Sequence, residues 1–118
     1  MIEAPAFARE WIAAWNGRDL EAILAHYSDD IVFASPKAAT ITGSPVVNGK
    51  EALRAYWREA LDRAPNLHFQ LLEVFAGSDC VSIVYLRNGA MRVCETMEFS
   101  NGIVVRGHVA HQCGSSTA

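Results

Sequence analysis

The chain has 118 residues, of which 51% are apolar and 19% are charged, and its formal net charge is −3. This length and composition predict one globular domain with an ample core. Lys and Arg residues are not clustered, so we expect no nucleic-acid partner. No apolar run approaches the length of a membrane span, and the N-terminal residues lack the pattern of a signal peptide, so we expect no membrane association.

The residue types that commonly bind metals and cofactors form no known binding motif in this sequence. Cys80, Cys94 and Cys113 include no CxxC pair, and the four histidines include no HExxH motif. The glycines are scattered in turns and form no phosphate-binding loop. We therefore expect neither a metal nor another cofactor. An odd number of cysteines in a domain with an ample core predicts free thiols in a reducing cytoplasm.

Helices are predicted first. Apolar residues recur at helical spacing over residues 6–15, and Asn16-Gly17 is a suitable stop because both residues tolerate the left-handed conformation. Asp19 then caps a second helix that reaches Tyr27. A short strand is predicted over 31–35. Residues 37–48 are rich in Thr, Gly, Ser and Pro and predict a long loop, with at most a short strand at 40–42. A third helix is predicted from about 49 to 64.

The remaining segments predict strands at 67–76, 80–86, 91–99 and 103–111, with Asn-Gly dipeptides at two of the breaks. Helices on one face of an antiparallel sheet give an α+β fold. The prediction is a cone-shaped, curved antiparallel sheet wrapped around three N-terminal helices. The cone would leave an interior for a ligand.

Three stretches carry a family resemblance: WIAAWNGRDLEAILAHYSDDIVFASP, GKEALRAYWREAL and CETMEFSNGIVVRGHVAH. The chain resembles the nuclear transport factor two-like superfamily, with its SnoaL-like and ketosteroid isomerase-like domains. The resemblance covers roughly residues 7–111 and implies a cystatin-like cone. We expect a single domain over residues 1–112, and the GSSTA sequence at the end predicts a flexible tail at 113–118. The resemblance also implies a pocket for a hydrophobic small molecule.

The isomerase branch of this superfamily has four characteristic polar positions. In this sequence Trp11 stands in place of a tyrosine, Ser35 in place of an aspartate base, and Trp57 in place of a supporting tyrosine. Glu95 stands in place of an aspartic acid, so only this position keeps an acid. A serine cannot act as a carboxylate base. The resemblance therefore argues against classical steroid isomerisation.

Strand parity indicates which side chains share a face. If Glu95 faces the interior, Val93 and Met97 do so too, and such apolar neighbours would raise the pKa of its carboxyl. For the last strand, the resemblance implies that Arg106 and His108 face the pocket, whereas composition favours the alternate, apolar face. In the first case His108 would transfer a proton, Glu95 would orient it or act as the acid, and Arg106 would hold an anion.

Val93 and Met97, on the same face as Glu95, are ligand-binding candidates, and the other candidates are aromatic or small polar residues. Trp11 and Trp57 are expected in the pocket wall, and Trp15 in the ordinary core. Tyr27 either points its hydroxyl into the cavity or packs in the core. Ser35 either donates to a ligand or satisfies backbone at the strand end.

Three functions remain open: a cofactor-free acid–base enzyme of the isomerase, cyclase, dehydratase or hydrolase type, a non-catalytic small-molecule-binding protein, and a dimeric association module. The segment 80–86 is apolar on both faces. A strand of this kind is covered on both faces, so a homodimer through the sheet is expected under all three hypotheses.

Overall fold

The computed structural model describes residues 2–113. The elements are α1 (Ala4–Asn16), α2 (Leu20–Leu24), β1 (Tyr27–Ala34), α3 (Pro36–Thr42), β2 (Val46–Asn48), α4 (Lys50–Arg63), β3 (Phe69–Ala76), β4 (Cys80–Arg87), β5 (Met91–Ser100) and β6 (Ile103–His111). None of the helices in these residues has the length and hydropathy needed to cross a membrane. The predicted tail falls on residues 114–118, apart from Cys113, and so lies outside the described residues.

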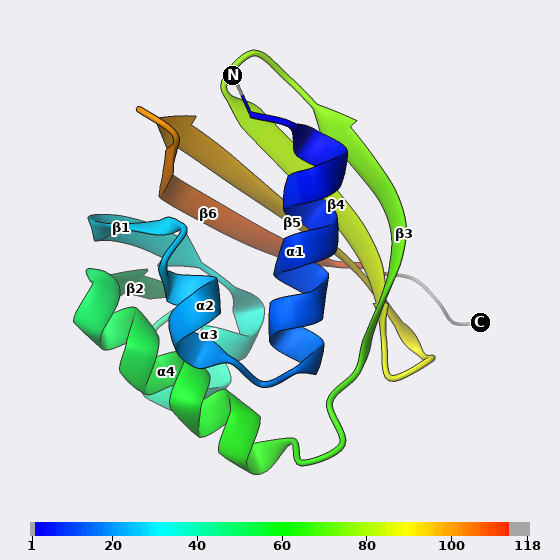
Figure 1. Cartoon of the computed structure of the whole chain (residues 1–118). Helices are drawn as coiled ribbons and strands as arrows, with labels where there is room; N and C mark the ends of the chain where they lie inside the picture. The colour runs from blue at the N-terminus through cyan, green and yellow to red at the C-terminus, as the bar shows by residue number, and fades with distance from the viewer. Residues whose placement is uncertain (1, 114–118) are drawn as a thin grey trace.

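All six strands form one sheet in the order β2-β1-β6-β5-β4-β3. Strands β3 to β6 form the predicted antiparallel meander, while β1 lies parallel to β6 and antiparallel to β2. The sheet curls around α1, and α4 lies beside β1 and β2 (Figure 1). The predicted α+β fold, a curved sheet around N-terminal helices, is confirmed, and its curvature leaves room between α4 and the sheet.

Two tight turns set the register of the meander. Asn88-Gly89 and Asn101-Gly102 have positive φ at both residues, 53° and 69° in the first turn and 52° and 79° in the second. Positive φ at both central residues is typical of the type I′ turn, which Asn-Gly favours. Asn101-Gly102 is a two-residue loop between the paired Ser100 and Ile103, whereas the first loop has Ala90 as an additional residue before Met91. The sequence-based hairpin predictions are confirmed.

The connection after α1 differs from the prediction. Gly17 has a right-handed φ of −80°, and the left-handed residue is Arg18, with φ 57°. Asn16 has another function: its Nδ2 donates to the Phe69 carbonyl and its Oδ1 accepts from the Phe69 amide, each over 2.8 Å. The Asn16 side chain thereby pairs with the backbone of Phe69, at the start of β3, and joins α1 to β3. The second helix also ends earlier than predicted, at Leu24, because Tyr27 already belongs to β1.

The predicted loop at 37–48 contains a helix. Ser35 accepts a hydrogen bond from the Lys37 amide at its N-terminus, Pro36 occupies the first turn, and Gly43 ends it with φ 87°. Pro and Gly are typical of loops, but Pro also begins a helix when a capping serine precedes it, and Gly also ends one. The expected strand at 40–42 is wrong, and the short strand in this segment is β2.

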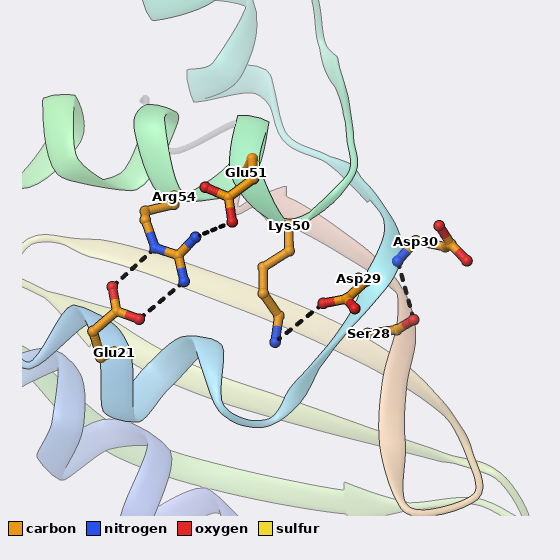
Figure 2. Close-up of polar contacts among 7 residues, drawn as sticks. All are labelled: Glu21, Ser28, Asp29, Asp30, Lys50, Glu51 and Arg54. Atoms are coloured by element: carbon orange, nitrogen blue, oxygen red, sulfur yellow. Dashed lines mark hydrogen bonds and ion pairs between the residues drawn. The ribbon is translucent and has the colours of Figure 1, made fainter.

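Charged side chains connect α2, α4 and β1 on the outside of the molecule. Arg54 on α4 donates to both carboxylate oxygens of Glu21 on α2, each over 2.9 Å, and also contacts Glu51 (Figure 2). Lys50 lies 3.8 Å from Asp29 on β1. The Arg54–Glu21 pair is bidentate, the arrangement in which a surface ion pair helps to fix geometry. It supports the position of α4, which carries Tyr56 and Trp57.

Candidate functional site

A hollow of about 220 Å³ lies between α4 and the concave face of the sheet. Its walls are mainly aromatic and aliphatic, formed by Trp15, Phe33, Tyr56, Trp57, Ala60, Ala64, Leu67, Phe69, Tyr85 and Val109. Its polar lining residues are Ser35, Lys37, Arg87, Asn88, Glu95 and His111. An apolar cavity with a few convergent polar groups is the usual form of a small-molecule site.

Glu95 is the buried acid of this hollow. It lies in the middle of β5, opposite Ile83 on β4 and Val109 on β6, and only 5% of it is exposed. The hydroxyl of Tyr85 donates to its Oε1 over 2.7 Å. Burial raises the pKa of Glu95 to about 7, and the hydrogen bond from Tyr85 partly opposes this rise. The expected placement of Glu95 on the interior face, beside the buried Val93 and Met97, agrees with the structure.

Tyr85 was missed by the sequence-based interpretation. It lies on the inner face of β4, directly opposite Val93, and stacks on Phe69 at 4.1 Å between ring centroids. Its own pKa is raised well above the ordinary value, first by burial and then by the charge of Glu95. The sequence signal was incomplete. A two-residue Asn-Gly loop would pair Arg87 with Ala90 and place Tyr85 and Glu95 on opposite faces, whereas the structure pairs Arg87 with Met91 and so places both on one face.

The placement that the resemblance implied for Arg106 and His108 is wrong. Both side chains are exposed on the outer face of the sheet, where Arg106 lies 3.7 Å from Glu98 and His108 stands opposite Thr96. The residue that faces the hollow beside Glu95 is Val109, with His111 two positions farther along. The apolar row of the last strand is therefore internal, as composition favoured, because burial of valine is favourable and burial of an unpaired guanidinium is costly.

Four of the expected ligand-binding residues are buried in the core and do not line the hollow. Trp11, Tyr27, Val93 and Met97 are at most 1% exposed, and none of them lines the hollow. The indole Nε1 of Trp11 donates to the Tyr27 hydroxyl over 3.1 Å, which in turn contacts Met97 Sδ at 3.6 Å. For Tyr27, the core alternative is thus the one that the structure supports.

Trp15, expected in the ordinary core, lines the hollow in place of Trp11. The two residues share one helix face, but Trp15 is one turn farther along α1. Trp57 and Ser35 do line the hollow, as expected. Trp57 packs edge-on against Trp15, with 5.1 Å between ring centroids. Ser35 lines the hollow, and its hydroxyl accepts from the Lys37 amide at the start of α3, so the backbone alternative holds and donation to a ligand stays a prediction.

The chain is similar in sequence and in fold to known proteins. The family model of the SnoaL-like domain matches residues 8–108. The chain belongs to this family. A SnoaL-like protein of unknown function from Burkholderia thailandensis is 40% identical, covers 95% of this chain and 98% of its own, and superposes with a TM-score of 0.88. No curated protein matches the chain.

Two more distant structures share the fold of this SnoaL-like domain. A nuclear transport factor two-like protein of unknown function from Burkholderia pseudomallei is 18% identical, with coverage of 95% and 92% of the two chains and a TM-score of 0.77. TerC, co-crystallised with polyporic acid, is 14% identical, with coverage of 91% and 90% and a TM-score of 0.76. The predicted membership in the nuclear transport factor two-like superfamily is confirmed.

The polar groups of this SnoaL-like domain limit its chemistry. Among residues 2–113, no three His, Cys, Asp or Glu side chains are close enough together to hold a metal ion. Glu95 is the one carboxyl among the residues that line the hollow, and the lining hydroxyls are those of Ser35, Tyr56 and Tyr85. Burial raises the pKa of Tyr56, and the Ser35 hydroxyl opposes this rise. The arrangement can exchange one proton with a molecule in the hollow.

One wall group is not satisfied within the protein. The Nε1–H of Trp15 is buried and has no acceptor in the described part of the chain. A buried donor without an acceptor costs about 1–3 kcal/mol. Together with the buried carboxyl of Glu95, it shows that the lining of the hollow is not optimised for stability alone.

Proposed function

We propose that this SnoaL-like domain binds a small, flat, apolar molecule in the hollow and that Glu95 exchanges a proton with it, without a metal or other cofactor. One observation carries the proposal: a buried carboxyl with a pKa raised by burial to about 7 lines an aromatic cavity. Perturbed acids of this kind cluster at functional sites. That TerC was co-crystallised with polyporic acid supports small-molecule binding by this fold.

A pKa near neutrality makes Glu95 suitable for both directions of proton transfer. Its ionised form accepts a proton from a carbon acid, and its protonated form returns the proton to another atom of the same molecule. The Tyr85 hydroxyl holds Oε1 by a 2.7 Å hydrogen bond, so the carboxyl is oriented before a ligand arrives. Isomerisation, cyclisation, dehydration and hydrolysis all use steps of this type.

The test uses 2-tetralone, an apolar two-ring ketone with acidic protons next to its carbonyl. Thermal-shift measurements with a panel of apolar carbonyl compounds and lactones first establish binding. Exchange of the 2-tetralone α-protons in D₂O is then followed by NMR. We expect the wild-type protein to accelerate exchange and Glu95→Gln to lose roughly 10²–10⁴-fold of that rate. Glu98→Gln, which alters a half-exposed carboxyl on the outer face of the same strand, should retain it.

The outcomes separate the alternatives. Binding without accelerated exchange would contradict the catalytic proposal and leave a non-catalytic small-molecule-binding protein. Absence of binding across the whole panel would contradict the proposed function and leave the association module.

We also propose that a second copy of the chain covers the outer face of the sheet. The support is that Val84 and Leu86, on the face of β4 opposite to Ile83 and Tyr85, remain half-buried in the single chain. Sedimentation velocity should show a dimer, and Val84→Glu should shift it towards monomer. A wild-type monomer at tens of micromolar would contradict this arrangement.

We further propose a cytoplasmic location. Cys80, Cys94 and Cys113 are all free thiols, and Cys113 is exposed. Exposed free thiols persist in a reducing compartment. Fractionation of cells that express the tagged full chain tests the location, and recovery in the secreted fraction would contradict it.

A further inference from the structure

The mouth of the hollow is basic. Lys37, Arg87 and His111 all contribute to its lining, and the one acidic lining residue is Glu95. These residues come from α3, the end of β4 and the end of β6, so they converge from three elements. Such convergence of like charges is unfavourable without a counter-charge.

The three basic groups affect one another. The pKa of His111 is lowered, first by burial and then by the positive charges of Arg87 and Lys37. Arg87 also lowers the pKa values of Tyr56 and Tyr85, against the larger effect of their burial. The field of Arg87 thus extends into the aromatic part of the hollow.

Neither Lys37 nor Arg87 lies within 4.0 Å of a carboxylate in residues 2–113, whereas Arg54, Arg63, Arg92 and Arg106 each have a carboxylate partner within that distance. Glu95 is the one acid of the lining, and because burial raises its pKa to about 7 it is only partly ionised near neutral pH. Lys37 and Arg87 therefore have no carboxylate at ion-pair distance in the described part of the chain.

The strand register gives the depth of the groups on β4, β5 and β6. On the concave face, Ile83, Glu95 and Val109 form one row, Tyr85, Val93 and His111 form the next, and Arg87 and Met91 form the outermost. Rows on one face are two residues, or about 7 Å, apart. His111 thus lies about 7 Å outward of Glu95 along the strands, and the Arg87 backbone about 13 Å outward.

We infer that the ligand is a small aromatic or alicyclic organic anion, whose ring system lies against the indole and phenol walls and whose acidic group, such as a carboxylate, is held at the mouth by Lys37 and Arg87. This inference rests on the proposed function and names the substrate class of its site. The hollow, at about 220 Å³, is smaller than the usual drug-sized pocket of 300–1,000 Å³, so it suits one or two rings. Such a molecule reaches from the basic mouth to the row of Glu95.

The test compares two probes of one shape, 2-naphthoate and 2-naphthamide, by isothermal titration calorimetry at pH 7.5. We expect the anion to bind at least 10-fold more tightly than the amide in 20 mM NaCl. That preference should shrink in 500 mM NaCl, because salt screens the partly exposed charges. Arg87→Gln and Lys37→Gln should each reduce the preference. Arg9→Gln, which removes the same charge from an exposed position on α1, should leave it unchanged.

A second measurement uses the wild-type protein alone. An anion bound beside His111 should raise the pKa of its imidazole, followed by NMR titration, whereas 2-naphthamide should not. Equal affinity for the two probes, or an unchanged His111 pKa at saturation with 2-naphthoate, would overturn the inference and leave the apolar pocket standing. If neither probe binds and 2-tetralone exchange is not accelerated, the proposed function falls and the inference falls with it.

Discussion

The Tyr85 hydroxyl donates a 2.7 Å hydrogen bond to Oε1 of Glu95, between neighbouring strands on the concave face of the sheet. Ile83 stands directly opposite Glu95, so Tyr85 reaches the carboxyl diagonally from one row farther out. The bond favours the ionised form of the acid while burial favours the neutral form, and burial has the larger effect. The balance sets the protonation of Glu95 near neutral pH.

The buried acid predicts an inverted pH dependence of stability. The pKa of Glu95 is raised from 4.5 to about 7, so between these values the native state keeps a proton that the unfolded chain loses. The free energy of unfolding therefore falls as the pH rises through this window, by about 3 kcal/mol in total for this group. Glu95→Gln does not ionise, so its stability relative to wild type should increase from pH 5 to pH 8 in urea titrations.

The matched control for that experiment is Glu98→Gln. Glu98 lies on the same strand but on the outer face, where its side chain is 47% exposed and 3.7 Å from Arg106. Its stability curve should run parallel to that of the wild type between pH 5 and pH 8. A Glu95→Gln curve that also runs parallel would show that Glu95 titrates normally.

Removal of the Tyr85 hydroxyl should move the titration of Glu95 upward. Tyr85→Phe keeps the ring that stacks on Phe69 but deletes the donor that stabilises the carboxylate. We expect the pKa of Glu95 to rise above its wild-type value, measured by infrared or ¹³C NMR titration of the carboxyl. Any base-dependent exchange of 2-tetralone should then shift to higher pH. An unchanged or lowered pKa would contradict the hydrogen bond.

Tyr27 and Tyr56 should respond differently to loss of their hydroxyls. Tyr27→Phe leaves the buried Nε1–H of Trp11 without its acceptor and should cost about 1–3 kcal/mol of unfolding free energy. Because Tyr27 does not line the hollow, the affinity for 2-naphthoate should stay within about twofold of the wild-type value. Tyr56→Phe changes a lining residue and should alter binding with less effect on stability. A large loss of 2-naphthoate binding in Tyr27→Phe would contradict the placement of Tyr27 outside the site.

Asn16 should be important for the joint between α1 and β3. Asn16→Ala removes a donor and an acceptor that pair with the backbone of Phe69, each over 2.8 Å. We expect a loss of about 1–3 kcal/mol in urea denaturation, because the Phe69 backbone groups lose their partners. Asn66→Ala, at an exposed position of the connection before β3, serves as the control and should cost less than about 0.5 kcal/mol. Equal effects would show that the amide pairing contributes nothing.

Parity gives the faces of β4 and β5 only when the length of the loop between them is known. The Asn88-Gly89 dipeptide identifies the hairpin from the sequence, but the additional loop residue Ala90, seen in the structure, is what places Glu95 and Tyr85 on one face. On β6 the same reasoning left either face possible. The resemblance favoured the face of Arg106 and His108, which is not the face that lines the hollow. An irregularity in the pairing between Glu98 and Phe99 changes the alternation near the turn, so parity cannot be counted through it from the sequence.

The sequence by itself determined the order of the helices and strands outside residues 36–48 and the two Asn-Gly turns, because these depend on local spacing and on the residues that form a turn. The interior position of Glu95 was one of two possible faces until the strand register decided it. Only the tertiary structure decided that Trp15 and not Trp11 lines the hollow, that β1 lies beside β6, and that Lys37 and Arg87 meet at one mouth. These features depend on how elements far apart in the chain pack together. Burial of the apolar faces selects that packing as a whole, and no single segment encodes it.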